Sequence, residues 1–367
     1  PVLDARVWVL WALTTLLAAS SARNPLYAAV LLAVSTVVGT VCAADRAQRV
    51  PLSPLRFATL AIPLSALFNG LTAHIGDTVI LRLPDWLPLL GGPITLEALA
   101  FGAINGLTLT VIFSGFAVFN QVTPVRDLIK LTPRAFHEAG VVLSIALTFI
   151  PQTTRSLKRI REAQAVRGHR VRGVRDWLPI FVPLLVSGLE RSMALAEAMV
   201  ARGYGAVSDQ EQPLRTQGLL ALGLSALLGG WLAWLFLPSW RGIGLGAMIA
   251  GTGLIAVVVW LAGRGISHTT YRRRRWTSRD TLVVLGCGLT LGVTLVPLPL
   301  VNRSTLYYST YPSLTRPAFD PFVGLAMLGL LVPAVVNAEG QAGSTRSIQS
   351  EAIGGADERL GQETEDG

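Results

Sequence analysis

A short pattern that could do chemistry occurs twice in the basic middle of the chain. Glu162-Ala163-Gln164-Ala165-Val166-Arg167-Gly168 recurs 35 positions later as Glu197-Ala198-Met199-Val200-Ala201-Arg202-Gly203. In both copies good helix formers precede a glycine, the residue favoured just past a helix end. Each copy therefore predicts the last turns of a helix with an arginine at its C-terminus. A long cationic side chain there can reach into a neighbouring protein, and two copies suggest two similar partners.

The alternative for each arginine is a charged helix end that serves only as a topology anchor in a membrane. Motifs for other chemistry are missing from the sequence. Its two lysines, Lys130 and Lys158, follow Ile129 and Leu157, so no Gly-Lys-Ser/Thr phosphate loop exists. The four histidines lack metal-ligand spacing, and no Gly-x-Ser-x-Gly motif occurs. We therefore expect no catalytic residue, no metal and no cofactor bound by this chain.

The composition is that of an integral membrane protein. Of the 367 residues, 51% are hydrophobic and only 14% are charged, which is too apolar for an ordinary soluble domain. The net charge of +9 does not indicate a nucleic-acid-binding protein, because the cations lie between apolar runs without interleaved aromatic residues. The only two cysteines, Cys42 and Cys287, lie within apolar runs, which argues against a disulfide framework.

Eight apolar runs have about the length of a membrane helix. Four of them form a predicted N-terminal membrane block, residues 1–119, and four form a C-terminal block, residues 216–337. We therefore predict an all-α integral membrane protein, a polytopic helical bundle of about eight spans. The runs cover residues 7–22, 26–44, 57–74, 94–119, 216–237, 242–262, 281–300 and 319–337.

Residues 120–215, between the two blocks, are predicted to form a basic module on the cytoplasmic face. Two apolar pieces lie inside it, at 139–150 and 177–189. Each is only about a dozen residues long, and the second contains Pro179 and Pro183, so we expect interfacial or re-entrant segments rather than spans.

The charge distribution predicts the orientation. With the central module and both termini in the cytoplasm, 26 of the 31 lysines and arginines lie inside, as the positive-inside rule requires. The tail, residues 338–367, is rich in Gly, Ser, Gln and acidic residues and is predicted to be disordered. The five cations left outside are Arg23, Arg82, Arg241, Arg303 and Arg316.

The central motifs resemble those of a known family. Pro151-Gln152, the two motifs ending in Arg-Gly, and the Tyr204-Gly205 after the second are similar to the transmembrane T component of energy-coupling factor transporters, a family that includes the cobalt-transport permease. Asn24-Pro25-Leu26 also resembles that family's N-terminal region, so the resemblance covers about residues 1–237. Two departures stand out: the first motif reads Val166-Arg167-Gly168 instead of the usual Ala-Arg-Gly, and the spans after about residue 242 exceed the usual length.

The resemblance implies a coupling-helix module in an importer of the cell membrane. Two cytoplasmic ABC ATPases would bind ATP, a separate small membrane subunit would bind a vitamin or metal ion, and this chain would be the non-catalytic scaffold. The helices ending at Arg167 and Arg202 would each dock in a groove of one ATPase. There an arginine can form a charge-assisted pair with a carboxylate, and small neighbours allow close approach. The partner-binding residues would be Glu162, Val166, Arg167, Gly168, Glu197, Ala201, Arg202 and Gly203.

The resemblance also suggests a mechanism. Closure of the ATPases on ATP would drag both coupling helices, and short helices at 136–151 and 177–189 would pass the shift to the substrate-binding subunit. Pro179 and Pro183 would act as breaks between moving pieces.

Two other functions remain open at this point. One is the permease of a conventional ABC importer, which Glu162-Ala163-Gln164 and Leu178-Pro179 fit loosely, although a duplicated motif within one chain does not fit it. The other is a membrane-embedded lipid-modifying enzyme whose arginines hold phosphate headgroups. Its discriminating feature would be a membrane-facing acid, histidine or metal site, and the sequence shows none. The transported substrate and the identity of the two ATPases are not encoded in these motifs.

Overall fold

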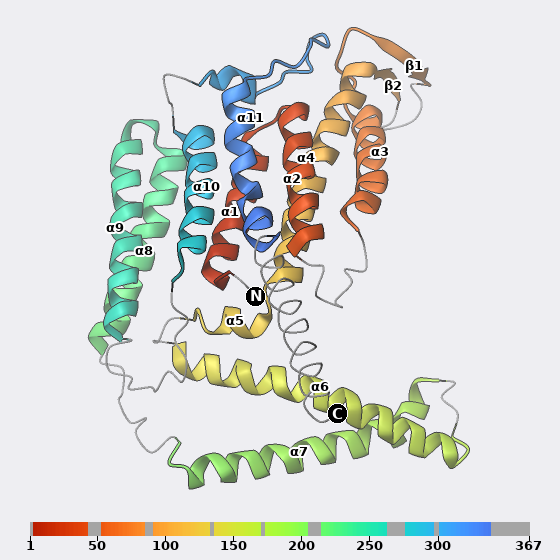
Figure 1. The fold of residues 1–367 in the computed structure, drawn as a ribbon, viewed down its shortest axis with the longest axis vertical. Coiled ribbons are helices and arrows are strands. Elements are labelled where there is room, and N and C mark those ends of the chain that lie inside the picture. Colours follow the sequence, from red (N-terminus) through yellow and green to blue (C-terminus); the bar gives the residue numbers. More distant parts are fainter. Residues whose placement is uncertain are drawn as a thin grey trace, which may run out of the picture. The chain divides into compact units, whose positions relative to one another are not determined.

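The computed structural model of the chain describes residues 3–42, 53–84, 91–132, 136–169, 173–204, 214–262, 276–296 and 301–338. The described part is almost entirely helical (Figure 1), which confirms the predicted all-α class. Within these ranges the only sheet is a small antiparallel hairpin of β1 (Val79–Leu83) and β2 (Gly92–Thr95), which the sequence did not predict. The predicted disordered tail, from residue 339 onward, lies outside the described residues.

The chain forms two compact units. Residues 1–127 and 272–367 make the first unit, and residues 128–271 make the second. The helices of the first unit are α1 (Ala5–Ser21), α2 (Pro25–Cys42), α3 (Pro54–Thr72), α4 (Leu96–Val122), α10 (Ser278–Leu295) and α11 (Pro321–Leu328), with short 3-10 turns at Arg303–Leu306 and Gly329–Leu331. The short helix α5 (Val125–Ile129) lies at the boundary between the units.

Polar side chains fix the starts of the helices in the first unit. The Asp4 carboxylate accepts a hydrogen bond from the backbone N–H of Arg6, and the Thr95 hydroxyl accepts one from Ala98, so both satisfy free donors in a first helical turn. The buried Asp280 carboxylate accepts from the Thr277 N–H and also from the Asp4 N–H, at 2.9 and 3.0 Å. The start of α10 is therefore tied to the start of α1.

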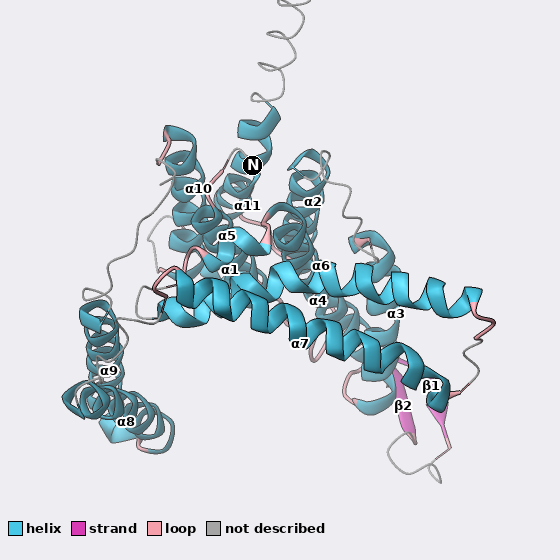
Figure 2. Cartoon of the chain, turned by 90° about the horizontal axis from the view of Figure 1, so that it is seen from below, coloured by secondary structure: helices cyan, strands magenta, loops and turns pink. Residues whose placement is uncertain are grey.

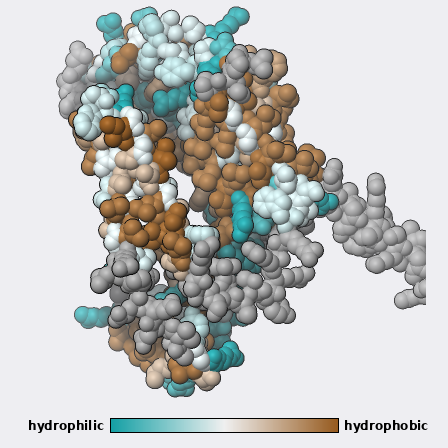
Figure 3. Space-filling view, turned by 90° about the vertical axis from the view of Figure 1, so that its left-hand side faces the viewer, coloured by the Kyte–Doolittle hydropathy of each residue, from teal (hydrophilic) through white to brown (hydrophobic). Residues whose placement is uncertain are grey.

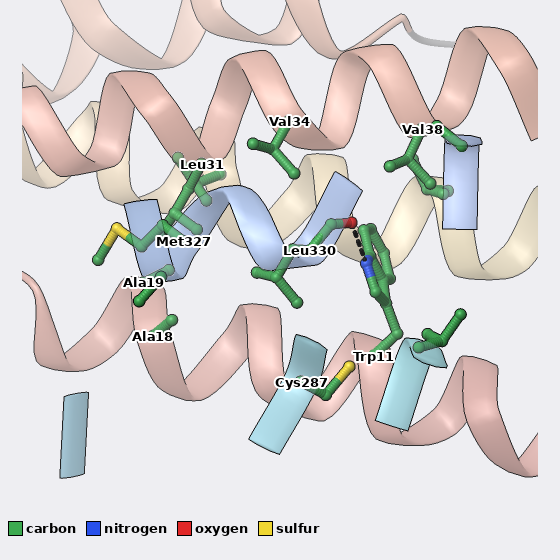
Figure 4. Packing of buried hydrophobic residues seen from close by; sticks show 14 of the residues in the cluster. Trp11, Ala18, Ala19, Leu31, Val34, Val38, Cys287, Met327 and Leu330 are labelled. Atoms are coloured by element: carbon green, nitrogen blue, oxygen red, sulfur yellow. Dashed lines mark hydrogen bonds between the residues drawn. The ribbon is translucent and has the colours of Figure 1, made fainter. Parts of the chain in front are cut away.

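The core of the first unit brings the two ends of the chain together. Trp11 of α1 is fully buried and donates its indole N–H to the Leu330 carbonyl at 3.0 Å (Figure 4). Leu31 of α2 and Met327 of α11 pack in the same cluster. Helices near the C-terminus thus complete a core that begins with α1 and α2.

A second link between the chain ends is polar. The Asn24 amide donates to the carbonyls of Thr305 and Ala318 at 2.7 and 2.8 Å. The Tyr27 hydroxyl accepts from the Asp320 N–H at 2.8 Å. Because Asn24 is buried, these bonds satisfy a polar group that would otherwise be costly inside the protein.

The second unit contains two long helices where short segments were expected. They are α6 (His137–Val166, 30 residues) and α7 (Leu178–Ala201, 24 residues), with a 3-10 turn at Val174–Trp177 between them. The expectation of short segments at 139–150 and 177–189 was therefore wrong, whereas their interfacial location stays a prediction. Hydropathy detects only the apolar part of each helix, and the helix continues through polar sequence to the repeated motif.

The expected proline breaks were wrong as well. Pro179 lies in the first turn of α7, where a proline costs no hydrogen bond. Pro183 lies inside α7, and Pro151 lies inside α6, yet both helices continue through them. Each helix is thus one continuous element.

The remaining helices of this unit are α8 (Leu214–Phe236) and α9 (Arg241–Ala262), with a 3-10 turn at Pro238–Trp240 between them. They pack against each other through glycines. A Cβ atom on Gly244 would lie 2.8 Å from the Gly230 carbonyl oxygen, and one on Gly251 would lie 2.7 Å from that of Gly223. Only glycine allows the two backbones to approach so closely, as in small-residue packing of membrane helices.

Within the described residues, eight helices are long and apolar enough to cross a membrane: α2, α3, α4, α7 with its preceding turn, α8, α9, α10 and α11 extended to Ala338. The number matches the prediction, but α7 is among them and α1, at 17 residues, is slightly short. On the face drawn in Figure 3, apolar side chains form broad brown areas on the outside of the protein. Such a surface is typical of lipid-facing helices, so the chain is a multi-pass membrane protein.

Candidate functional site

The first motif forms the end of α6. The Gly168 N–H bonds to the Ala165 carbonyl, and the His169 N–H bonds to the Gln164 carbonyl, both at 3.0 Å. This pair of bonds is the Schellman motif, which closes a helix with a glycine just beyond its end. Arg167 is the last residue before that glycine, and its side chain is exposed.

The second motif forms the end of α7 in the same way. The Gly203 N–H bonds to the Val200 carbonyl at 2.8 Å, and the Tyr204 N–H bonds to the Met199 carbonyl at 3.0 Å. Arg202 occupies the position that Arg167 has in the first copy, and it is also exposed. The predicted helix ends are confirmed in both copies, down to the position of the arginine.

The two glycines are required by the backbone. Gly168 and Gly203 have φ angles of +80° and +76°, in the left-handed region that other residues adopt only at a cost. No atom would meet an added Cβ within 4 Å at either position, so backbone conformation, not crowding, selects glycine. The same backbone geometry therefore presents the same cation at two places.

Helices α6 and α7 form an antiparallel pair that holds the two ends apart (Figure 2). The Gln164 amide donates to the Pro179 carbonyl at 3.4 Å, and the Arg191 guanidinium donates to the Ser156 hydroxyl at 3.0 Å. The end of α6 thus lies beside the start of α7, and Arg202 lies at the far end of α7. A helix of 24 residues is about 36 Å long. The structure therefore builds two separate sites from the predicted residues.

Two hydrogen bonds involve the described residues on either side of the connection between α6 and the 3-10 turn at Val174–Trp177. The His169 Nε2 lies 2.7 Å from the Asp176 carbonyl oxygen, so this nitrogen carries the proton and donates. The Asp176 carboxylate accepts from the Gly173 N–H at 2.9 Å. His169, two residues after Arg167, is therefore hydrogen-bonded to the 3-10 turn that precedes α7.

The two glutamates of the motifs do not contact the arginines. Glu162 lies 3.9 Å from the Lys158 ammonium one turn earlier, and both side chains are well exposed. Glu197 is exposed on α7. Within the described ranges neither Arg167 nor Arg202 has a carboxylate within ion-pair distance. Both guanidinium groups are therefore available to an outside partner.

An apolar face of α7 was missed by the sequence reasoning. Ile180 is the buried residue of α7, and in the described part of the chain the opposite side of the helix is exposed. Its apolar side chains are half or more exposed and follow one another at spacings of three, four or seven residues, as one face of a helix requires. They are Leu178, Val182, Leu185, Leu189, Met193 and Val200. Hydropathy alone does not show which side of α7 is exposed, so the sequence did not reveal this face.

No group of three His, Cys, Asp or Glu side chains in the described part of the chain could hold a metal ion.

Comparison with known proteins gives one family. The model of the family described as CbiQ, cobalt transport protein, matches residues 2–214, more than half of the chain. The match includes both helix ends with their arginines. Helix α8 begins at the last matched residue, and α9, α10 and α11 lie beyond the match.

Curated relatives carry the name energy-coupling factor transporter transmembrane protein EcfT. The protein of Streptococcus thermophilus is 35% identical over 112 residues, 29% of this chain and 41% of the relative. That of Bacillus selenitireducens is 31% identical over 178 residues, 43% and 64% of the two chains. That of Bacillus subtilis is 28% identical over 171 residues, 39% and 63%. The chain thus spans less than two thirds of the length of each of these relatives.

Proposed function

The chain belongs to the cobalt transport protein family CbiQ, and on this premise we propose that it is the transmembrane coupling subunit of an energy-coupling factor importer. Two cytoplasmic ABC ATPases bind and hydrolyse ATP, and a separate small membrane subunit binds the substrate, a vitamin or a transition-metal ion. The chain itself catalyses nothing and binds no cofactor. It lies in the cell membrane with both termini in the cytoplasm, as the charge distribution favours.

The observation that carries this proposal is the pair of matching helix ends. Arg167 and Arg202 are exposed at the tips of two helices with the same Schellman geometry, about 36 Å apart along α7. Two equivalent tips fit two similar ATPases. In each groove the guanidinium would pair with a carboxylate, and the small residues Gly168, Ala201 and Gly203 would allow close approach. Glu162 and Glu197 would contact the partner from the last turns of the two helices, before the arginines.

Motion then passes through whole helices. When ATP closes the two ATPases, their grooves approach each other and move the two tips. Because α6 and α7 are continuous and hydrogen-bonded to each other, each moves as a rod instead of in short pieces. The uncovered apolar face of α7 offers a surface to the substrate-binding subunit, which would receive the movement.

The test is affinity purification of the complex from its native membrane with the wild type, Arg167→Glu, Arg202→Glu and the double variant. Burying the groove carboxylate beside a glutamate should cost about 2–5 kcal/mol per site, so the double variant should lose the ATPases and the single variants should uncouple hydrolysis from uptake. Arg241→Glu, an equal charge change on an exposed arginine at the start of α9, is the control.

Each other outcome has a clear meaning. Unchanged transport in both single variants and in the double variant would contradict the proposal. Two copies of this chain with two ATPases and no small membrane subunit would indicate a conventional ABC permease instead. A wild type that brings down no ATPase would favour the membrane-embedded enzyme.

A further inference from the structure

The exposed side of α6 carries a row of cations just behind the first helix tip. Arg155, Lys158 and Arg159 are all exposed, and helical periodicity places them within roughly 100° of one another around the axis. Ser156 and Ile160 are partly buried, and Ser156 accepts a bond from Arg191 of α7. The cations therefore lie on a side of α6 that α7 leaves open.

The row of cations lies on the same line of α6 as the residues at its C-terminal end. Arg155, Arg159, Glu162 and Val166 follow one another at spacings of three or four residues, which puts them on one line along the helix. Val166, at the end of this line, is 90% exposed and precedes Arg167. Arg155 lies about 18 Å behind Arg167 along the axis. A protein docked on the tip of α6 is wide enough to cover the row.

The second copy has no such row. With the same offset of 35 positions, Arg155 corresponds to Glu190, Lys158 to Met193 and Arg159 to Ala194. Residues 155–167 hold five cations and one acid, whereas residues 190–202 hold two of each. The second copy's Arg191 is turned inward to the hydroxyls of Ser156 and Ser187. The two helix ends therefore have the same geometry, but the helical segments that precede them differ in charge.

Within the coupling function proposed above, on which this inference rests, we propose that the two docking sites are chemically different. The ATPase at the α6 tip presents an acidic surface beside its groove, which pairs with Arg155 and Arg159. The ATPase at the α7 tip is held by the tip alone. In the described part of the chain Arg155 and Arg159 have no ion-pair partner of their own, whereas Lys158 is already paired with Glu162. Free cations next to a docking arginine complement an acidic partner.

The experiment isolates each tip in the intact complex. Arg202→Glu leaves the α6 tip to hold the ATPases, and Arg167→Glu leaves the α7 tip. Complexes captured from native membranes are washed with KCl from about 0.05 to about 0.5 M, which shortens the screening length severalfold. The ATPase retained through the α6 tip should fall at least about threefold across this range, and the ATPase retained through the α7 tip should change much less.

A matched pair of variants separates the row from charge in general. Arg159→Glu and Arg161→Glu make the same charge change two residues apart, but helical rotation puts Arg161 on a different side of α6. In the Arg202→Glu background, Arg159→Glu should remove most of the remaining ATPase and Arg161→Glu should not. If a single tip cannot hold the ATPases, Arg159→Glu and Arg161→Glu are compared with both tip arginines intact. Only Arg159→Glu should then lower the KCl concentration at which half of the ATPase is released.

The inference is overturned if both tips show the same salt dependence, or if Arg159→Glu behaves like Arg161→Glu. It is also overturned in favour of a lipid surface if Arg159→Glu leaves ATPase retention unchanged but lowers the phosphatidylglycerol that co-purifies with the complex. A wild type without any ATPase contradicts the coupling function itself, so the two failures are distinguishable.

Discussion

At the scale of single residues, two glycines decide where two arginines lie. Gly168 and Gly203 take positive φ angles, and each thereby lets the chain leave the helix directly after an arginine. The arginines need no partner within their own helix to be held at the tip, because the backbone bonds of the Schellman motif do this.

Replacing Gly168 or Gly203 by alanine should therefore displace the arginine without removing it. A left-handed alanine costs about 1–2 kcal/mol, which the last turn can relieve by changing its backbone path. We expect weakened ATPase retention with each variant, less severe than with Arg167→Glu, measured by co-purification. Gly188→Ala is the control, because Gly188 lies inside α7 with open space around it, and alanine there should be neutral or slightly stabilising. Equal loss from all three variants would contradict the role of the left-handed backbone.

These helix ends could be predicted because helix termination is local. A run of helix formers, an arginine and a glycine specify the cap wherever the helix lies in the fold. The roles of Arg155 and Arg159 could not be read in the same way, since only the position of α7 shows which side of α6 is open. For the same reason the apolar face around Leu189 was not anticipated.

At the scale of elements, the helices of the second unit differ in whether their surfaces pack against another helix. Helices α8 and α9 interlock through glycines, whereas α7 leaves one apolar face without a neighbour in the described part of the chain. Each surface gives a separate prediction.

The glycine contact predicts a strong difference between two neighbouring positions of α9. Gly244 touches the Gly230 carbonyl, whereas nothing lies within 4 Å of a Cβ on Gly246. Gly244→Leu should force the helices apart and destabilise the protein by about 1–3 kcal/mol or more, while Gly246→Leu should be tolerated. Thermal unfolding of the purified protein in detergent measures both. Equal melting temperatures for the two variants would show that the α8–α9 contact is not close.

The open face of α7 predicts a binding defect without a folding defect. Leu189→Gln replaces a side chain that is 64% exposed, so the melting temperature of the isolated chain should hardly change. Retention of the small membrane subunit should fall, because the variant places an amide in an apolar contact. Glu190→Gln, on another side of the same helix, is the control. Normal retention with Leu189→Gln would assign this face to lipid.

At the scale of the whole chain, the first unit depends on contacts between residues that are distant in sequence. Trp11 and Leu330 are 319 positions apart, and Asn24 and Thr305 are 281 apart. Hydropathy located the helices at both ends, but nothing in the sequence pattern showed that α10 and α11 pack with α1 and α2. The match to the family model ends at residue 214, so it did not show this packing either.

The buried indole bond gives a test of this long-range core. Trp11→Phe removes the N–H that Leu330 accepts and leaves its carbonyl unpaired in a buried place, which should destabilise the first unit by about 1–3 kcal/mol. Trp231→Phe, at an exposed position of α8, makes the same chemical change and should have little effect. Melting curves of the two variants measure both effects. A larger loss of melting temperature with Trp231→Phe than with Trp11→Phe would contradict this role of the indole bond.

The continuity of α7 has one more consequence. Since no break interrupts its 24 residues, the helix fixes the angular phase of Arg202 relative to Leu178 at its start as firmly as it fixes their separation. One inserted residue would turn the second arginine by about 100° while moving it only about 1.5 Å. The length of this helix can therefore change only in steps that keep Arg202 facing its partner.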